Sequence, residues 1–309
     1  MFRQPTSNAV PLDVQPRLES WEGRDHPSQT ALQTYLDHVE DTVGRELVAV
    51  RGDAAVSLDV GLPHDRPLTG GGGDLDNFLY PVVRRLGPSR FAAAWATKKH
   101  GRSSICAQSA VPASRDLPAG WRFAAVRTTK ASESRAWKQE VAGQLPAVEP
   151  SLGAVELQLC FRVAPQRNWA TLWKPAIDAL GPILGVERPE NPFNPRDDRV
   201  TSLGLHRNVD EDLRHTVEIG IWWRSARTKP LTCHSRAPAS PARILGTSLP
   251  THDDQPSVDG CIPKEGTGEG SQGSTFGVPV RSQRVSATPR QWWMDDPSPD
   301  GGGGRWADT

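Results

Sequence analysis

Hydrophobic residues recur at three- and four-residue steps between Thr30 and Leu47, which predicts a helix with one apolar face. A shorter helix is expected from Ser132 to Gln144, and a third apolar stripe runs from Trp169 to Leu184. Apolar runs that are too short for helices flank these segments, as in Ala55 to Val60. The pattern therefore predicts an α+β protein.

The pattern of the chain is repeated. Ala55 to Val60 matches Ala154 to Leu159, and Asn77 to Pro81 matches Thr171 to Pro175. Each copy is preceded by a helix candidate and followed by another helix and then strands. We therefore expect two tandem units, each built as helix, strand, polar loop, helix and strand pair.

The repeat divides the chain into expected regions. Residues 1–28 have little apolar periodicity and are interpreted as a flexible leader, followed by units at 29–130 and 131–227. Residues 228–309 are dense in Pro, Gly, Ser and Thr, which predicts a disordered tail. Its tryptophans, Trp292, Trp293 and Trp306, are interpreted either as an anchor for a partner or as exposed residues without a role. The tail itself is either functional or an out-of-frame extension.

Charge excludes binding to nucleic acid through global basicity, because Lys plus Arg and Asp plus Glu both number 36. Local cations could still meet phosphates, or could belong to a solvated hairpin; they are Arg84, Arg85, Lys98, Lys99 and Arg102. We expect no membrane span, because no apolar run is long enough. We also expect no nucleotide cofactor, because the glycine-rich phosphate and dinucleotide motifs are missing.

The cysteines have no zinc-ligand spacing. Cys106 and Cys160 lie in apolar, strand-like runs, which favours buried thiols over disulfides. Together with the missing targeting segment, this indicates a cytoplasmic protein.

Candidate chemistry begins at Gly70 to Pro81, where four glycines precede Asp74-Leu75-Asp76-Asn77. In an extended chain Asp74 and Asp76 share a face, and paired carboxylates suit Mg²⁺ or Mn²⁺ better than Zn²⁺. The alternative is a turn in which the Asp and Asn side chains cap the following helix.

The second unit contributes Lys174 and Asp178, one helical turn apart, and the pair Asp197 and Asp198 before a strand expected from Val200 to Leu205. Adjacent Asp residues at a strand start usually face solvent or cap a turn. Here they follow a helix that carries a lysine.

These motifs resemble the RusA-type Holliday junction resolvases. In that family an Asp-x-Asp-Asn turn leads into a helix with a Lys and an Asp, and an Asp-Asp pair opens the next strand. The family's members are small α+β homodimers, so the tandem repeat would be a monomer that acts as an intrachain pseudo-dimer. The resemblance implies a Mg²⁺-dependent endonuclease for branched DNA, with Asp74, Asp76 and Asp198 as metal ligands. Lys174, Asp197 and Asp178 would be the catalytic residues.

The chain departs from the family pattern in both units. Tyr80 and Arg84 replace the helix Lys and Asp of the first unit, and Ser89-Arg90 stands where the Asp-Asp pair is expected. In the second unit the Asp-x-Asp-Asn positions become Asn168, Ala170 and Thr171. Family dimers carry a full residue set in each subunit, so here either two half-sites meet or both have decayed. The alternatives to an active enzyme are an inactive relative that binds nucleic acid or a protein partner, and an α+β protein of unknown role.

Overall fold

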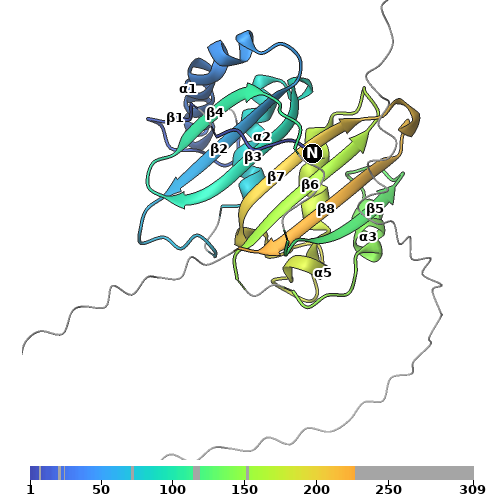
Figure 1. The fold of residues 1–309 in the computed structure, drawn as a ribbon. Coiled ribbons are helices and arrows are strands. Elements are labelled where there is room, and N and C mark those ends of the chain that lie inside the picture. Colours follow the sequence, from blue (N-terminus) through green and yellow to red (C-terminus); the bar gives the residue numbers. More distant parts are fainter. Residues whose placement is uncertain are drawn as a thin grey trace, which may run out of the picture. The chain divides into compact units, whose positions relative to one another are not determined.

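The computed structural model describes residues 1–226, except 7, 20, 21, 24, 71, 72, 114–118, 151 and 152. The expected tail at 228–309 lies outside the described residues, and so do Cys233 and Cys261. The fold is mixed α+β, as predicted, with an 8-stranded sheet in the order β1-β4-β2-β3-β7-β6-β8-β5 (Figure 1).

Two consecutive sets of elements build the sheet. The first set consists of β1 (Val10–Pro11), α1 (Pro27–Ala49), β2 (Ala54–Leu62), α2 (Leu75–Leu86), the 3-10 turn η1 (Pro88–Arg90), β3 (Phe91–His100) and β4 (Ser104–Ser109). The second set consists of β5 (Arg122–Thr128), α3 (Arg135–Gln144), β6 (Val155–Val163), η2 (Trp169–Leu172), α4 (Trp173–Asp178), α5 (Gly181–Leu184), η3 (Asp197–Arg199), β7 (Val200–Val209), η4 (Glu211–Leu213) and β8 (Val217–Ser225).

The two sets have the same strand arrangement. In the first, β2 is parallel to β3 and antiparallel to β4, and β1 adds to the far side of β4. In the second, β6 is parallel to β7 and antiparallel to β8, and β5 adds to the far side of β8. The sheet therefore contains the same four-strand arrangement twice, joined where β3 pairs antiparallel with β7.

The boundaries differ from those expected from the sequence. β4 ends at Ser109 and β5 begins at Arg122, so the two sets join between these residues and not at 130/131. The described part of residues 1–28 is not a free leader, because β1 pairs with β4 and the side chain of Leu12 is buried. β1 is only two residues long, too short to produce a hydrophobic pattern.

A matching irregularity fixes the correspondence between the two halves. The register of β2 on β3 shifts after Ala54, and the register of β6 on β7 shifts after Val155. Ala54 therefore corresponds to Val155, whereas the sequence match aligns Val56 with Val155. A slip by an even number of residues keeps the same side chains on each face of a strand, so the hydrophobic pattern could not detect it.

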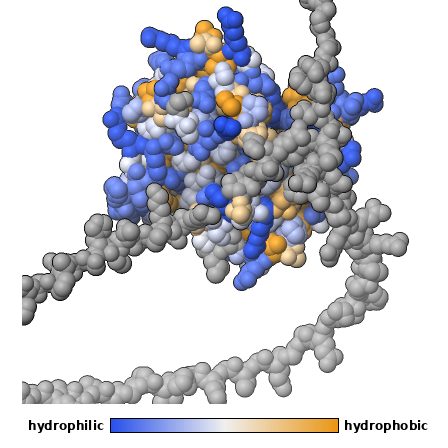
Figure 2. Space-filling model, viewed as in Figure 1, coloured by the Kyte–Doolittle hydropathy of each residue, from blue (hydrophilic) through white to orange (hydrophobic). Residues whose placement is uncertain are grey.

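The helices and the amino-terminal segment cover opposite faces of the sheet. The large core packs α1, α2, α3 and the α4–α5 segment against one face. On the other face Phe2 packs against Ala55, Ala93 and Trp95, and its backbone N–H donates to His206 Nδ1, so the amino terminus lies over the middle of the sheet (Figure 1). The thiols of Cys106 and Cys160 are buried and form no disulfide, as predicted. Figure 2 shows hydrophilic residues over most of the visible surface, with hydrophobic ones in small separate spots.

The join between the halves has a specific steric requirement. Trp95 of β3 is the register partner of Gly204 of β7, and a Cβ at position 204 would lie 2.7 Å from the buried indole of Trp95. Gly204→Ala is therefore expected to lower the free energy of unfolding by about 1–3 kcal/mol, because the ring cannot move without disturbing its packing with Phe2, Ala55 and Ala93.

Chemical denaturation of the full chain measures this effect. Gly44→Ala in α1 is the matched control, because a Cβ there meets nothing within 4 Å and alanine favours helix. The control should be neutral or stabilising. Equal stability of the two variants would show that the close contact of Trp95 with Gly204 is not required.

Candidate metal centre

The glycine-rich turn places two acids at the start of α2. Gly70 and Gly73 have φ values of 85° and 141°, which side-chain-bearing residues rarely adopt. Asp74 immediately precedes α2, but its carboxylate makes no capping bond to the helix backbone. It accepts a hydrogen bond from Asn77 Nδ2 at 3.0 Å instead. The alternative expected from the sequence, an ordinary capping turn, does not describe Asp74.

Asp76 lies in the first turn of α2 and is almost fully buried, with 3% of the residue exposed. A carboxylate near a helix amino terminus is favoured by the helix dipole, but burial opposes its ionisation. A buried acid with few hydrogen-bond donors needs a cation nearby.

The segment from Trp169 to Leu184, predicted as one apolar stripe, forms three short pieces, η2, α4 and α5. Its apolar residues are buried as expected, including Leu172, Trp173 and Ile177. Lys174 and Asp178 lie on α4, and Lys174 Nζ is 3.2 Å from Asp178 Oδ1. The expected single helix is broken into three pieces, but the four-residue spacing of Lys174 and Asp178 on α4 still places their charges together.

The Asp pair lies in η3, directly before β7. Arg199 anchors this turn: its guanidinium donates to the backbone oxygens of Gly153 and Leu184 at distances between 2.8 and 3.2 Å. Consecutive side chains in a tight turn point in different directions, so Asp197 and Asp198 do not share one environment. β7 extends to Val209, beyond the predicted end at Leu205.

Residues from both halves converge at one point. Oxygen atoms of Asp74, Asp76 and Asp197 all lie within 4.8 Å of one another. Lys174 Nζ lies 2.9 Å from Asp197, 3.9 Å from Asp74 and 4.0 Å from Asp76. We call Asp74, Asp76, Asp197 and Lys174 the carboxylate cluster. The cluster could hold a metal ion. The acid that the second half contributes is Asp197, whereas the family resemblance implied Asp198 as the metal ligand.

Burial and mutual repulsion disturb the ionisation of the cluster. Burial raises the pKa of Asp76 to about 7, against the attraction of Lys174 and with the repulsion of Asp197. Burial, together with repulsion from Asp197, raises the pKa of Asp74 to about 6. Burial alone would lower the pKa of Lys174, but the attraction of Asp76, Asp197 and Asp178 outweighs it and raises that pKa. The acids therefore ionise together only at the expense of stability, unless further positive charge is present.

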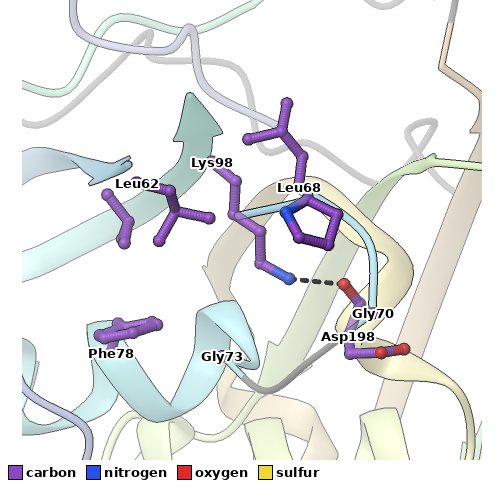
Figure 3. A pocket seen from close by; sticks show the side chains of 9 residues that line it. Leu62, Leu68, Gly70, Gly73, Phe78, Lys98 and Asp198 are labelled. Carbon is purple, nitrogen blue, oxygen red and sulfur yellow. Dashed lines mark hydrogen bonds between the residues drawn. The ribbon is translucent and has the colours of Figure 1, made fainter. Parts of the chain in front are cut away.

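Lys98 approaches the same region from β3. The residue is buried, with 8% exposed, and its ammonium donates to the backbone oxygen of Asp198 at 2.6 Å. Figure 3 shows this bond across a hollow lined by Leu62, Leu68 and Phe78, with Gly70 and Gly73 at its edge. Burial lowers the pKa of Lys98, although Asp74 and Asp198 attract its charge. Lys98 was expected either to meet phosphate or to lie on a solvated hairpin, so its burial is a correction: its side chain lines the hollow with Leu68, Gly70 and Gly73.

Sequence reasoning missed Lys138. This residue, on α3, donates to Asp178 Oδ2 at 2.7 Å, while Asp178 Oδ1 faces Lys174. Asp178 thus bridges two lysines and holds Lys174 toward the carboxylate cluster. No motif marks Lys138, because its helix is separated in sequence from the acid that it contacts.

The other cations expected to meet nucleic acid are paired within the chain. Arg84 contacts Glu19, and Arg85 contacts Asp37 and Glu40. Lys99 contacts Asp59, and Arg102 contacts Asp13. Exposed pairs of this kind are weak and can exchange partners, so contacts to phosphate stay a prediction for these residues.

Comparison of the chain with protein-family models and with curated proteins found no match. Within the part of the chain that the structure describes, no helix has the length and apolar character needed to cross a membrane. The carboxylate cluster is therefore the feature of the chain that bears on its function.

Proposed function

We propose that this protein is an endonuclease for branched DNA that depends on Mg²⁺ or Mn²⁺ and works as a single-chain, RusA-like tandem. One observation carries the proposal: the two halves contribute to one cluster. Oxygens of Asp74 and Asp76 from the first half and of Asp197 from the second lie within 4.8 Å of one another, and Lys174 Nζ from the second half lies within 4.0 Å of all three acids. Each half lacks what the other supplies. Convergence of complementary half-sites favours a retained site over two decayed ones.

The donor atoms fit a hard divalent cation. The three candidate ligand atoms, from Asp74, Asp76 and Asp197, are all carboxylate oxygens. Carboxylates are preferred by Mg²⁺ and Mn²⁺, whereas zinc sites use Cys and His. Burial raises the pKa of Asp74 and of Asp76, so a bound cation would favour the ionised form of each acid.

The surrounding residues have roles in phosphodiester hydrolysis. A divalent cation supplies Lewis acidity and a bound water that ionises more readily. Asp74, Asp76 and Asp197 would hold that cation, and Lys174 would stabilise negative charge that develops on the phosphate. Asp178 and Lys138 orient Lys174, and Arg199 fixes the turn that carries Asp197.

A second candidate is a catalytically inactive relative that binds nucleic acid or a protein partner. Lys174 lies within 4.0 Å of four carboxylates, those of Asp74, Asp76, Asp178 and Asp197, and could itself serve as the cation of a purely structural ion-pair network. This candidate predicts no affinity for Mg²⁺ or Mn²⁺.

Cleavage of a synthetic four-way DNA junction by the full chain tests the proposal. Cutting is expected with Mg²⁺ or Mn²⁺, but not with EDTA, and Asp76→Asn is expected to abolish it. Calorimetric titration with Mn²⁺ should show binding that the same variant loses. Junction binding without cutting or Mn²⁺ affinity would favour the inactive relative.

A further inference from the structure

The repeated fold defines a second position related to the carboxylate cluster, which we call the mate position. η1 precedes β3 as η3 precedes β7, and Asp74 and Asn168 directly precede α2 and η2. Pro81 and Pro175 follow at the same spacing. The residues at the mate position are then Asn168, Ala170, Tyr80, Arg84 and Pro88, in place of Asp74, Asp76, Lys174, Asp178 and Asp197. Counted from the start of the strand, Pro88 and Ser89 take the place of the Asp pair, and not Ser89 and Arg90 as expected from the sequence.

The mate position is assembled, but from aromatic groups. Trp169 Nε1 donates to the backbone oxygen of Pro88 at 2.9 Å, so the start of η2 lies against η1. Trp173 packs against Trp169 at 4.9 Å and against Tyr80 at 6.3 Å between ring centroids. Trp169, Ala170 and Trp173 are each at most 2% exposed. Packed indole rings therefore occupy this region in place of carboxylates.

The charges of the mate position are also unsuited to a metal. Ala170 has no ligand atom where Asp76 has a carboxylate. Arg84 lies over the Tyr80 ring at 5.6 Å and pairs with Glu19. Among the described residues, only Asp74, Asp76 and Asp197 form a group of acids, histidines or cysteines able to hold an ion.

We infer that one chain makes a single incision each time it engages branched DNA. This inference rests on the proposed nuclease function. A four-way junction is resolved into two duplexes only by two cuts, in strands related by the two-fold symmetry of the junction. With one candidate metal centre among the described residues and an aromatic mate position, the chain would make only one. Its substrates would be DNA branches, such as flaps or forks, that a single nick processes.

The chemical step is ordinary hydrolysis. Water oxygen forms a bond to phosphorus, one P–O bond of the backbone breaks, and a proton passes to the leaving oxygen. One such event converts a closed circular DNA into a nicked circle, and two opposed events make it linear.

A supercoiled plasmid that extrudes a cruciform separates these outcomes. Supercoiling holds the cruciform open, and the first nick releases that stress, so a second cut must come from the same bound complex. The full chain is incubated with Mg²⁺ or Mn²⁺ under single-turnover conditions, and nicked and linear products are separated on a gel. At least about ten nicked circles per linear molecule are expected at all protein concentrations. Ser89→Ala, an exposed residue of η1, is the control and should give the same ratio.

Each result has a defined meaning. Mainly nicked circles, absent with Asp76→Asn, would support the inference. Mainly linear product would overturn it while leaving the nuclease function intact, because paired incision requires a second active centre. Intact plasmid together with an intact synthetic junction would overturn the nuclease function, and the inference with it.

Discussion

Asp197→Asn is expected to lower the rate of junction cleavage by about 100-fold or more, whereas Asp198→Asn should have a much smaller effect. Asp197 contributes an oxygen to the carboxylate cluster and contacts Lys174 at 2.9 Å. Asp198 instead offers its backbone oxygen to Lys98, a contact that the substitution retains. Loss of an outer-shell partner already reduces metal affinity or activity by about 10–100-fold, so loss of a direct ligand should exceed that.

Single-turnover cleavage with saturating enzyme measures both variants. Asp53→Asn is a matched control, because its exposed side chain pairs with Arg207 and not with the carboxylate cluster. A larger loss for Asp198 than for Asp197 would contradict the site and restore the assignment expected from the sequence. Equal activity of all three variants would show that the second half contributes no acid to the reaction.

The metal-free protein is expected to lose stability as the pH rises from about 4 to about 8. The pKa of Asp76 rises from its ordinary value of 3.8 to about 7, and that of Asp74 to about 6. A group whose pKa is higher in the folded state stabilises the protein most below its unfolded pKa. That contribution to stability disappears as the pH rises through the pKa that the group has in the folded state. For Asp76 the difference corresponds to about 4 kcal/mol.

Urea unfolding in EDTA at several pH values tests this prediction. Asp76→Asn should be more stable than the natural chain at pH 8 and similar near pH 4, because the amide carries no charge at either pH. Lys174 keeps Asp197 and Asp178 as partners in this variant. The exposed Asp53→Asn change should leave the pH profile unaltered. A natural chain that gains stability between pH 5 and 8, relative to Asp76→Asn, would contradict the assigned burial of Asp76.

Local structure was predictable where the hydrophobic period was strong. The stripe from Thr30 to Leu47 falls inside α1, and its apolar residues are buried. The helix expected from Ser132 begins at Arg135, because Ser134 caps it by accepting from the N–H of Trp137. The duplication was visible in the sequence, but the exact alignment of the two halves was not. Aligning Val155 with Ala54 or with Val56 places the same side chains on the same faces of the strands.

The site could be predicted only as a set of residues. Asp74, Asp76, Lys174 and Asp178 were chosen from their spacing, and the structure brings them together. The choice between Asp197 and Asp198 depends on the direction of each side chain in η3, which Arg199 fixes through distant backbone oxygens. Lys138 and the burial of Lys98 depend on contacts between elements far apart in sequence, so no local pattern reports them.

The pairing of β3 with β7 joins the two halves within one chain. Two separate subunits would have to meet by diffusion before acids from one could face a lysine from the other, and dilution would take them apart. Here the segment between Ser109 and Arg122 keeps the two partners at a high effective concentration. Assembly of the carboxylate cluster is therefore independent of how much protein is present, and each single molecule carries all of its residues.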